Sequence, residues 1–492
     1  MVYNKEKNII NRGKYFSWIQ QIWYTLPMLT FLPLFILIVA LPSVAATLGG
    51  EHFIGPAQPG NYTQAQGWVD VDAEGNIHVI YAGSKYRMGP AADSLGDAET
   101  FTTASDVWNA RMKVDAHGVP HIVYQVGIAS AAQTCWYTTR KDGNWITPKK
   151  VADAGEIGKA RAFYPSIAVD SAGNVLVAHW TVSSNKTSNN VVHYRWRSPE
   201  GTWGSDKSLP TTSWKSTPKV RLWNGGFYLL YMNTSEKSCI AGPVEAAGTF
   251  STDGICADNN IPNRTSLNEG SDFAFGPDSS MITVGGVRIG GSGPSGIFVG
   301  MNPGDGFGDS KYLGAMPNSG TKEGDIHAHV MYDDATGAIV TVGQDEGNGK
   351  SYFYVYENDA WTQGEEVSSG HGHQTCFRTG PSLADLPGRG LIMCYRSGDS
   401  LYLREISTEG VVNVDHTIPS FQTNRNLTQL HMLTGGVVSL LPFSGTGDYH
   451  LVVSDVTGRT VAEYPRVNKN SFSSVSANLG SGLYMFTFKQ LE

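Results

Sequence analysis

Residues 164–179 read Tyr-Pro-Ser-Ile-Ala-Val-Asp-Ser-Ala-Gly-Asn-Val-Leu-Val-Ala-His, two apolar runs joined by the tight turn Asp170-Ser-Ala-Gly173. Similar turns recur along the chain, with one marker each at residues 72, 115, 170, 224, 278, 334 and 388. The steps between markers are 43, 55, 54, 54, 56 and 54 residues. Such a period is typical of one four-stranded blade per repeat, because a blade needs neighbours to bury both of its faces. The sequence therefore predicts an all-β fold, a seven-bladed β-propeller.

Composition agrees with this fold class. The chain has 57 glycines and 23 prolines, and only 16% of its residues are charged, which suits a turn-rich all-β protein and argues against disorder. The formal net charge of −8 argues against a nucleic-acid partner, because phosphate binding needs a basic surface. An acidic substrate would therefore need a local cluster of basic residues.

The first 46 residues are predicted to be a signal peptide. Basic residues precede the apolar run 31–41, which is followed by Ser43-Val-Ala45, a pattern that signal peptidase accepts. The run contains Pro33 and is shorter than the roughly 20 residues of a membrane span. We expect cleavage near Ala45 or Ala46, secretion, and no stable membrane insertion afterwards; an uncleaved anchor is the alternative.

Two further segments are predicted after the signal peptide: a propeller over residues 47–425 and a C-terminal β segment over residues 426–492. The latter has a D-x-x-G-R turn at 455–459 and ends in the strand pattern Gly482-Leu-Tyr484-Met-Phe486. It resembles the small β-sandwich sorting domain that many Bacteroidetes proteins carry for secretion, which implies export to the cell surface. The alternative is a sandwich that simply packs on the propeller.

The five cysteines leave at least one without a disulfide partner. Cys239 and Cys256 lie in one repeat and are candidates for a disulfide in an oxidising compartment. Spacing suggests no partner for Cys135, Cys376 or Cys394.

Basic residues are expected to converge on one end of the propeller. Residues just before the first strand and just after the second strand of each blade meet at the mouth of the central funnel. This places there Arg111, Arg161, Lys219, Arg288, Arg378 and Arg396, with Asn109, Tyr164, Trp180 and Tyr231 beside them. Such clustering indicates a site for an anion, although each charge alone also fits a solvated or blade-pairing role.

His179 is the leading catalytic candidate because it ends an apolar strand where related strands carry tyrosine. Its unperturbed pKa of about 6.5 suits a general base or acid. The alternative is a histidine that hydrogen-bonds a neighbouring blade. His193 is a second candidate, whereas His78 and His121 lie inside strands and are expected to pack in the core.

A zinc site is the only cofactor that the sequence suggests, and no organic cofactor is expected. The motif His371-x-His373-x-x-Cys376 follows His327-x-His329 by one blade, and imidazole and thiolate ligands suit zinc. A structural ion joining two blades is the first interpretation. Exposed loop histidines near an unrelated cysteine are the alternative.

The runs 164–179 and 191–198, with Glu200-Gly-Thr-Trp203, resemble the BNR-repeat propellers, whose relatives include polysaccharide lyases acting on ulvan, a sulfated polymer of rhamnose and uronic acid. The resemblance implies a catalytic histidine at a strand end and an arginine facing the uronate carboxylate, for which His179 and Arg288 match best. His179 would be the base and is also a candidate acid, with Tyr231 or Tyr164 as the alternative acid. The implied substrate-binding residues are Arg161, Trp180, Lys219, Arg396, Asn109 and His193.

The expected function is thus β-elimination at C4–C5 of a uronate by a secreted, monomeric lyase acting on an acidic polysaccharide. Two alternatives stay open. One is a glycoside hydrolase of sialidase or rhamnosidase type on the same propeller, which would need carboxylates or a tyrosine nucleophile. The other is a propeller that binds carbohydrate without turnover.

Overall fold

The computed structural model describes residues 46–57, 67–127, 133–153, 161–182, 191–209, 212, 217–233, 235, 237–251, 254–256, 264–267, 272–276, 281–289, 295–302, 311–315, 326–333, 338–345, 351–357, 360–361, 365–367, 381–408, 426–433, 449–455, 460–467 and 482–490. Every regular element in these ranges is a β-strand, so the all-β prediction is confirmed. In the same ranges no helix has the length and apolar character needed to span a membrane. The chain divides into two units, residues 1–413 and 414–492. The predicted signal peptide lies outside the described residues, apart from Ala46.

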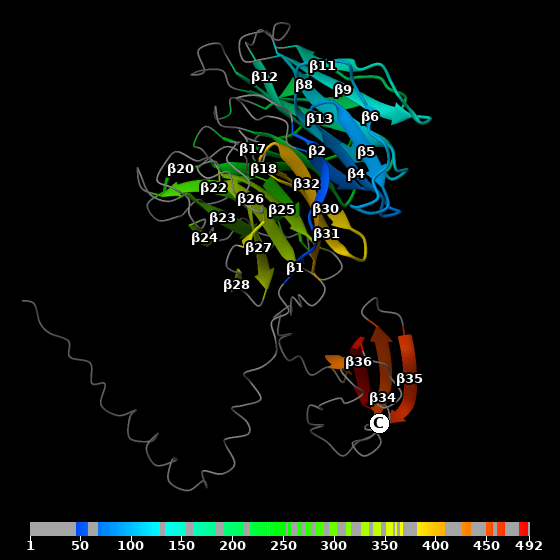
Figure 1. Cartoon of the computed structure of the whole chain (residues 1–492). Helices are drawn as coiled ribbons and strands as arrows, with labels where there is room; N and C mark the ends of the chain where they lie inside the picture. Colours follow the sequence, from blue (N-terminus) through cyan, green and yellow to red (C-terminus); the bar gives the residue numbers. More distant parts are fainter. Residues whose placement is uncertain are drawn as a thin grey trace, which may run out of the picture. The chain divides into compact units, whose positions relative to one another are not determined.

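In the first unit, six of the described sheets are built from strands that follow one another in the chain (Figure 1). The first contains β3 (Trp68–Val71), β4 (Ile77–Tyr81), β5 (Lys85–Gly89) and β6 (Glu99–Thr100). The second contains β7 (Val107–Val114), β8 (Pro120–Val126), β9 (Thr134–Lys141), β10 (Asn144–Trp145) and β11 (Lys149–Asp153). The third contains β12 (Arg161–Val169), β13 (Val175–Val182), β14 (Val191–Arg197) and β15 (Lys207–Ser208).

The other three follow the same antiparallel plan. One contains β16 (Lys219–Trp223), β17 (Gly226–Met232), β18 (Ser238–Val244) and β19 (Ile255–Cys256). The next contains β20 (Arg264–Leu267), β21 (Asp272–Phe275), β22 (Met281–Ile289), β23 (Ser295–Asn302) and β24 (Lys311–Ala315). The last contains β25 (Ile326–Tyr332), β26 (Ile339–Asp345), β27 (Ser351–Glu357), β28 (Ala360–Trp361) and β29 (Glu365–Glu366).

A further sheet is composite, because it joins strands from both ends of the first unit. It contains β30 (Ser382–Leu386), β31 (Gly390–Ser397) and β32 (Ser400–Ser407), and both β1 (Thr47–Leu48) and β2 (His52–Pro56) pair with β32. Its apolar residues pack against the β25–β29 sheet on one side and the β3–β6 sheet on the other. Both ends of the unit therefore meet in one sheet.

Apolar clusters fill the space between successive sheets. Val79 and Ile392 share one cluster, Val123 and Val177 another, and Trp196 and Phe227 a third. Each of these clusters unites residues of two neighbouring sheets, as expected when both faces of a blade must be covered. Together with the composite sheet, this arrangement makes the first unit a β-propeller.

The turns that mark the repeat form the predicted hairpins. In the turn after β12, Gly173 N–H donates to the Asp170 carbonyl at 3.0 Å, and Asn174 N–H donates to the Asp170 carboxylate at 2.7 Å. Gly173 has a φ of +83°, a conformation that costs glycine little. The hairpins after β3 and β7 have the same hydrogen bonds around Asp72 and Asp115.

The second unit contains one described sheet of order β33-β36-β34-β35. Its strands are β33 (Asn426–Leu433), β34 (Tyr449–Asp455), β35 (Thr460–Val467) and β36 (Gly482–Gln490). The two strand patterns noted in the sequence thus form β34 and β36, which pair with each other. The role in sorting stays a prediction.

The candidate disulfide is present. Cys239 and Cys256 lie opposite each other on β18 and β19 and are bonded. Cys135 and Cys394 are free and buried, and Cys376 lies outside the described residues.

Candidate functional site

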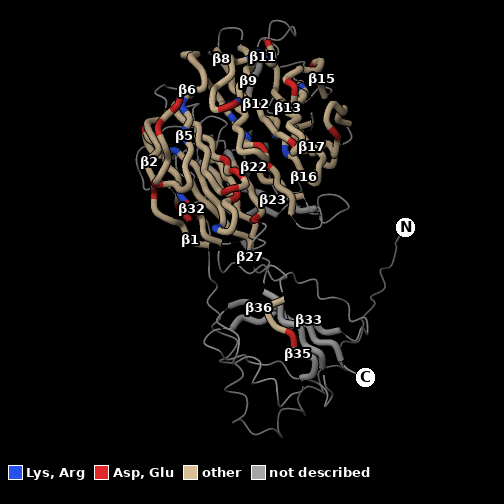
Figure 2. Tube along the Cα trace, turned by 90° about the vertical axis from the view of Figure 1, so that its right-hand side faces the viewer, with Lys and Arg blue, Asp and Glu red and all other residues tan. Residues whose placement is uncertain are grey.

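A cavity of about 450 Å³ lies where the inner strands of the propeller converge. Its lining comes mainly from β3, β7, β12, β16 and β30, with one residue from β21 and two from β25. Figure 2 shows basic and acidic positions near β12 and β16, two of these strands. The lining residues that carry charge or an aromatic ring include Trp68, Asp70, Arg111, Lys219, Arg221, Asp272 and His329.

The indole of Trp68 is the centre of the cluster in this cavity. The Arg111 guanidinium carbon lies 4.4 Å from the ring centroid and the Lys219 Nζ lies 5.9 Å from it, both within the range of cation–π attraction. The His329 ring meets the indole edge to face at 5.3 Å. Four sheets thus supply side chains to one small volume.

Asp272 is the carboxylate of this cluster and is only 2% exposed. It pairs with Arg221 Nη2 at 2.7 Å and His329 Nδ1 at 3.2 Å, and it accepts a hydrogen bond from Val330 N–H at 3.3 Å. Burial alone would raise its pKa, but the charge of Arg221 and the hydrogen bond with His329 hold that pKa well below the usual range. Asp272 therefore stays ionised at neutral pH.

Lys219 is buried among like charges. Desolvation and the charge of Arg111 lower its pKa to about 7, although Asp272 opposes the shift. Burial also lowers the pKa of Arg111 to about 10, and burial and the Lys219 charge lower that of His329 to about 4. Near neutral pH, Arg111 is charged, His329 is neutral, and Lys219 exchanges its proton. The cavity can therefore bind an anion and transfer a proton.

Two irregular residues precede the lining residues of β7 and β12. Asn109 has a φ of +46° and Tyr164 a φ of +50°, and each lies six residues before the aspartate of its turn. The pairing of β7 and β12 with the following strand shifts register at these residues. Such bulges bend a strand and change where the next side chains point, and Arg111 follows the first of them into the cavity lining.

Lys219 and Arg111 are the predicted basic residues that line the cavity. Asn109 is buried beside its bulge, and its amide donates to Gln125 Oε1 at 3.1 Å. Arg396 is 3% exposed, and its guanidinium binds the Gly398 carbonyl at 2.7 Å and Asp399 at 3.2 Å. Arg396 therefore holds its own hairpin and is absent from the cavity lining.

His179 does not lie where the sequence analysis expected it. Side chains alternate along β13, so that Val175 and Val177 face the β7–β11 sheet, and His179 shares their side. Its ring has no exposed surface, stacks on His193 at 5.5 Å, and has a pKa lowered to about 3 by burial and by His193. This placement corrects the expected position at the funnel mouth, because a fully buried imidazole does not reach a polymer.

The aromatic candidates are part of the core. Trp180 and Tyr231 are buried in the apolar cluster between the β12–β15 and β16–β19 sheets, and Tyr164 packs against it. Tyr164 stacks on Trp180 with ring centroids 6.3 Å apart. Since the Trp180 face is covered by protein, it does not offer the expected stacking surface for a sugar.

For some predicted residues, the structure describes the position on a strand but not the side chain. Arg161, Arg288 and His327 lie opposite Val182, Ser295 and Gln344, but their side chains lie outside the description. His371, His373, Cys376 and Arg378 lie outside the described residues altogether. The predicted roles of Arg161 and Arg288 and the zinc motif therefore stay predictions. His329, the neighbour of His327 in that motif, binds Asp272.

Trp68, Arg221 and Asp272 were not predicted from the sequence, and His329 was named only as part of the zinc motif. The predicted site residues were chosen at the ends of strands, whereas the cavity is lined mainly by residues within the innermost strands. A charged residue within the otherwise apolar first strand of a blade, as in Lys219-Val-Arg221, is the sequence signal that could have identified such residues. A buried charge is costly unless paired, so such residues point to a polar interior.

His78 and His121 pack as predicted. His78 binds Asp72 at 3.1 Å through Nε2 and the Tyr86 hydroxyl at 2.8 Å through Nδ1. His121 makes the same two contacts, with Asp115 at 3.2 Å and Tyr137 at 2.6 Å. Both imidazoles use both nitrogens to fix a hairpin to the next strand.

No family model and no curated protein matches the chain. Among solved structures, it is similar to an α-L-arabinanase of Penicillium chrysogenum, with 8% identity, a TM-score of 0.44, and coverage of 74% of this chain and 100% of that one. A GH93 α-L-arabinofuranosidase of Fusarium graminearum has 11% identity and a TM-score of 0.41, with 74% and 99% covered. The NanB sialidase of Streptococcus pneumoniae has 8% identity and a TM-score of 0.42, with 68% and 84% covered. At these scores the likeness carries no argument about activity.

Proposed function

We propose that this protein is a carbohydrate-active enzyme that binds an anionic sugar in the central cavity and cleaves a glycosidic bond there. The observation that carries the proposal is the pair of buried cations, Arg111 and Lys219, over the Trp68 indole beside an ionised Asp272. Three solved neighbours are named as enzymes of glycosidic bonds, but the proposal rests on the chemistry of the cavity.

Binding uses the cations and the indole. A guanidinium matches the two oxygens of a carboxylate or sulfate, so Arg111 is the anchor for the anionic group. The Trp68 indole holds Arg111 and Lys219 by cation–π contacts and so positions both cations for the anionic group. A cavity of about 450 Å³ is within the size range of small-ligand sites.

Hydrolysis is the first candidate reaction. Its transition state carries positive charge on the sugar ring, which a carboxylate that is ionised at neutral pH, such as Asp272, would stabilise. Protonated Lys219 donates its proton to the leaving oxygen as the glycosidic bond breaks, and water supplies the hydroxyl at the anomeric carbon. The pKa of Lys219, about 7, suits this exchange.

β-Elimination is the second candidate, favoured by the same lysine in its neutral form and by the resemblance to ulvan lyases. Arg111 would neutralise a uronate carboxylate, and neutral Lys219 would take the C5 proton. The C4–O bond would break as the C4–C5 double bond forms, and the protonated Lys219 would give the proton taken from C5 to the leaving oxygen. Lys219 replaces His179 as the base in this scheme.

The propeller is proposed to have seven blades, with the composite sheet as the blade that closes the ring. The seven turn markers of the sequence and the apolar packing of that sheet on both neighbours support this count. Export through a signal peptide, with sorting by the second unit, is also proposed. The Cys239–Cys256 disulfide supports an oxidising compartment.

The test is digestion of acidic glycans, with ulvan and a sialylated glycan as anionic substrates and arabinan as the neutral comparison. New reducing ends reveal any cleavage, and ultraviolet absorbance of an unsaturated uronate separates elimination from hydrolysis. We expect cleavage of an anionic substrate that is lost in Arg111→Gln and Lys219→Met.

The matched control is Lys150→Met, because Lys150 is an exposed lysine that pairs with Asp153 on the outer strand β11. It should retain wild-type activity. Activity that survives both cavity substitutions, or cleavage of arabinan alone, would contradict the proposal.

A further inference from the structure

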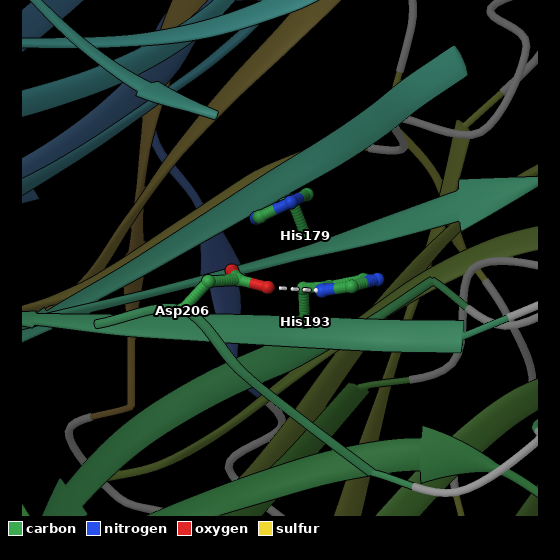
Figure 3. Close-up of side chains that lie close together, drawn as sticks. All are labelled: His179, His193 and Asp206. Atoms are coloured by element: carbon green, nitrogen blue, oxygen red, sulfur yellow. Dashed lines mark hydrogen bonds and ion pairs between the residues drawn. The ribbon is translucent and has the colours of Figure 1, made fainter. Parts of the chain in front are cut away.

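His179, His193 and Asp206 form a cluster in one sheet, outside the central cavity (Figure 3). His179 on β13 lies directly opposite His193 on β14, and Asp206 immediately precedes β15. The two rings are nearly parallel, at 15°, and His193 Nδ1 lies 2.6 Å from Asp206 Oδ2. One donor atom from each residue lies within 4.8 Å of the others.

The imidazole nitrogens of this cluster lack partners in the described part of the chain. Neither Nδ1 nor Nε2 of His179 has a hydrogen bond, and Nε2 of His193 has none. His179 is 0% exposed and His193 is 8% exposed, so water does not readily replace the missing partners. The contrast with His78 and His121, which use both nitrogens, is clear. Buried polar atoms are nearly always satisfied, so these point to a missing ligand.

We propose that His179, His193 and Asp206 bind a divalent transition metal ion, and that the ion is zinc. Two imidazoles and one carboxylate are a donor set that zinc uses, with a fourth position open to water. Zinc would lie about 2.0–2.2 Å from each donor, so the three donors, now within 4.8 Å of one another, would move closer together around the ion.

The exposure of the three side chains and the charge of a neighbouring arginine both bear on metal binding. Asp206 is exposed, whereas both histidines are buried. Arg195 is a neighbouring cation, and its guanidinium donates to the Gly204 carbonyl at 2.9 Å and to the Val151 carbonyl at 2.6 Å. Burial and the Arg195 charge lower the pKa of His179, which keeps that imidazole neutral, the form that binds metal. The ion would link β13, β14 and the segment before β15.

The experiment measures zinc binding by the full chain. The protein is stripped with a chelator, dialysed, and titrated with Zn²⁺ by calorimetry, and bound metal is counted by mass spectrometry. Cobalt substitution adds the visible spectrum of a site with nitrogen and oxygen ligands. We expect one bound zinc, with an affinity at least about tenfold weaker in Asp206→Asn and His193→Gln.

The matched control is Asp115→Asn, which alters a histidine–aspartate pair whose imidazole is already satisfied by Tyr137. It should bind zinc as the wild type does. Asp206→Asn changes an exposed residue, so it tests the site even if His193→Gln fails to fold. The proposal is overturned if the wild type binds no zinc, or if both variants bind it unchanged. Loss of binding only in His371→Ala would assign the ion to the predicted loop motif instead.

Discussion

Lys219 is the residue on which the two candidate reactions diverge. Its pKa of about 7 means that raising the pH through neutrality converts it from a proton donor to a proton acceptor. Hydrolysis with Lys219 as the acid should therefore slow as the pH rises through about 7. Elimination with Lys219 as the base should accelerate over the same range. A pH profile of kcat/KM measures the direction, and a profile unchanged in Lys219→Met would contradict both assignments.

Asp272 is expected to matter for stability as well as for chemistry. Asp272→Asn removes the negative charge that faces half-buried Arg221 and buried Lys219, and removing one partner from a buried group of charges costs roughly 3–5 kcal/mol of unfolding free energy. Urea unfolding measures the loss. Asp399→Asn is the control, since that carboxylate is 83% exposed and its loss should change stability by less than about 1 kcal/mol. Equal effects in the two variants would refute the buried pair.

At the scale of elements, the hairpin turns determine where each strand begins. Gly75 has a φ of +84°, and an added Cβ would meet nothing within 4 Å. Gly75→Ala should therefore cost about 1 kcal/mol through backbone strain alone. Gly75→Asn should cost less, because asparagine tolerates this conformation. Thermal unfolding of both variants, with Glu74→Ala as a neighbouring control, measures the difference, and a neutral Gly75→Ala would contradict the strain.

Strands and turns could be predicted from the sequence because their signals are local. The turn at 170–173 and the alternation around it contain the information for a hairpin. The face on which His179 lies depends instead on which sheet packs on each side of β13. Likewise, the cluster of Trp68, Lys219 and Asp272 unites residues about 150 and 50 positions apart in the chain, which no local pattern relates. Arg111 and Lys219 could therefore be predicted to face the cavity, but most of its other charged and aromatic lining residues could not.

At the scale of the whole propeller, the composite sheet should contribute much of the stability. Ile54 on β2 is 2% exposed and packs in the cluster with the β3–β6 sheet, so Ile54→Ala should cost about 2–5 kcal/mol. Phe53, its neighbour, is 59% exposed, and Phe53→Ala should cost less. Guanidinium unfolding of the two variants tests this, and equal losses would show that the N-terminal strands add little to the core.

The pairing of β1 with β32 also has a consequence for biogenesis. Thr47 lies opposite Ser407, so β1 cannot pair with β32 until almost the entire propeller has been synthesised. Until then, the sheets formed from the first and the last strands each have a strand edge without hydrogen-bond partners. Such edges favour aggregation while the chain folds slowly. The propeller of a nascent chain therefore cannot close until its last strands have been synthesised. An incompletely folded chain is compatible with passage through a narrow translocation channel.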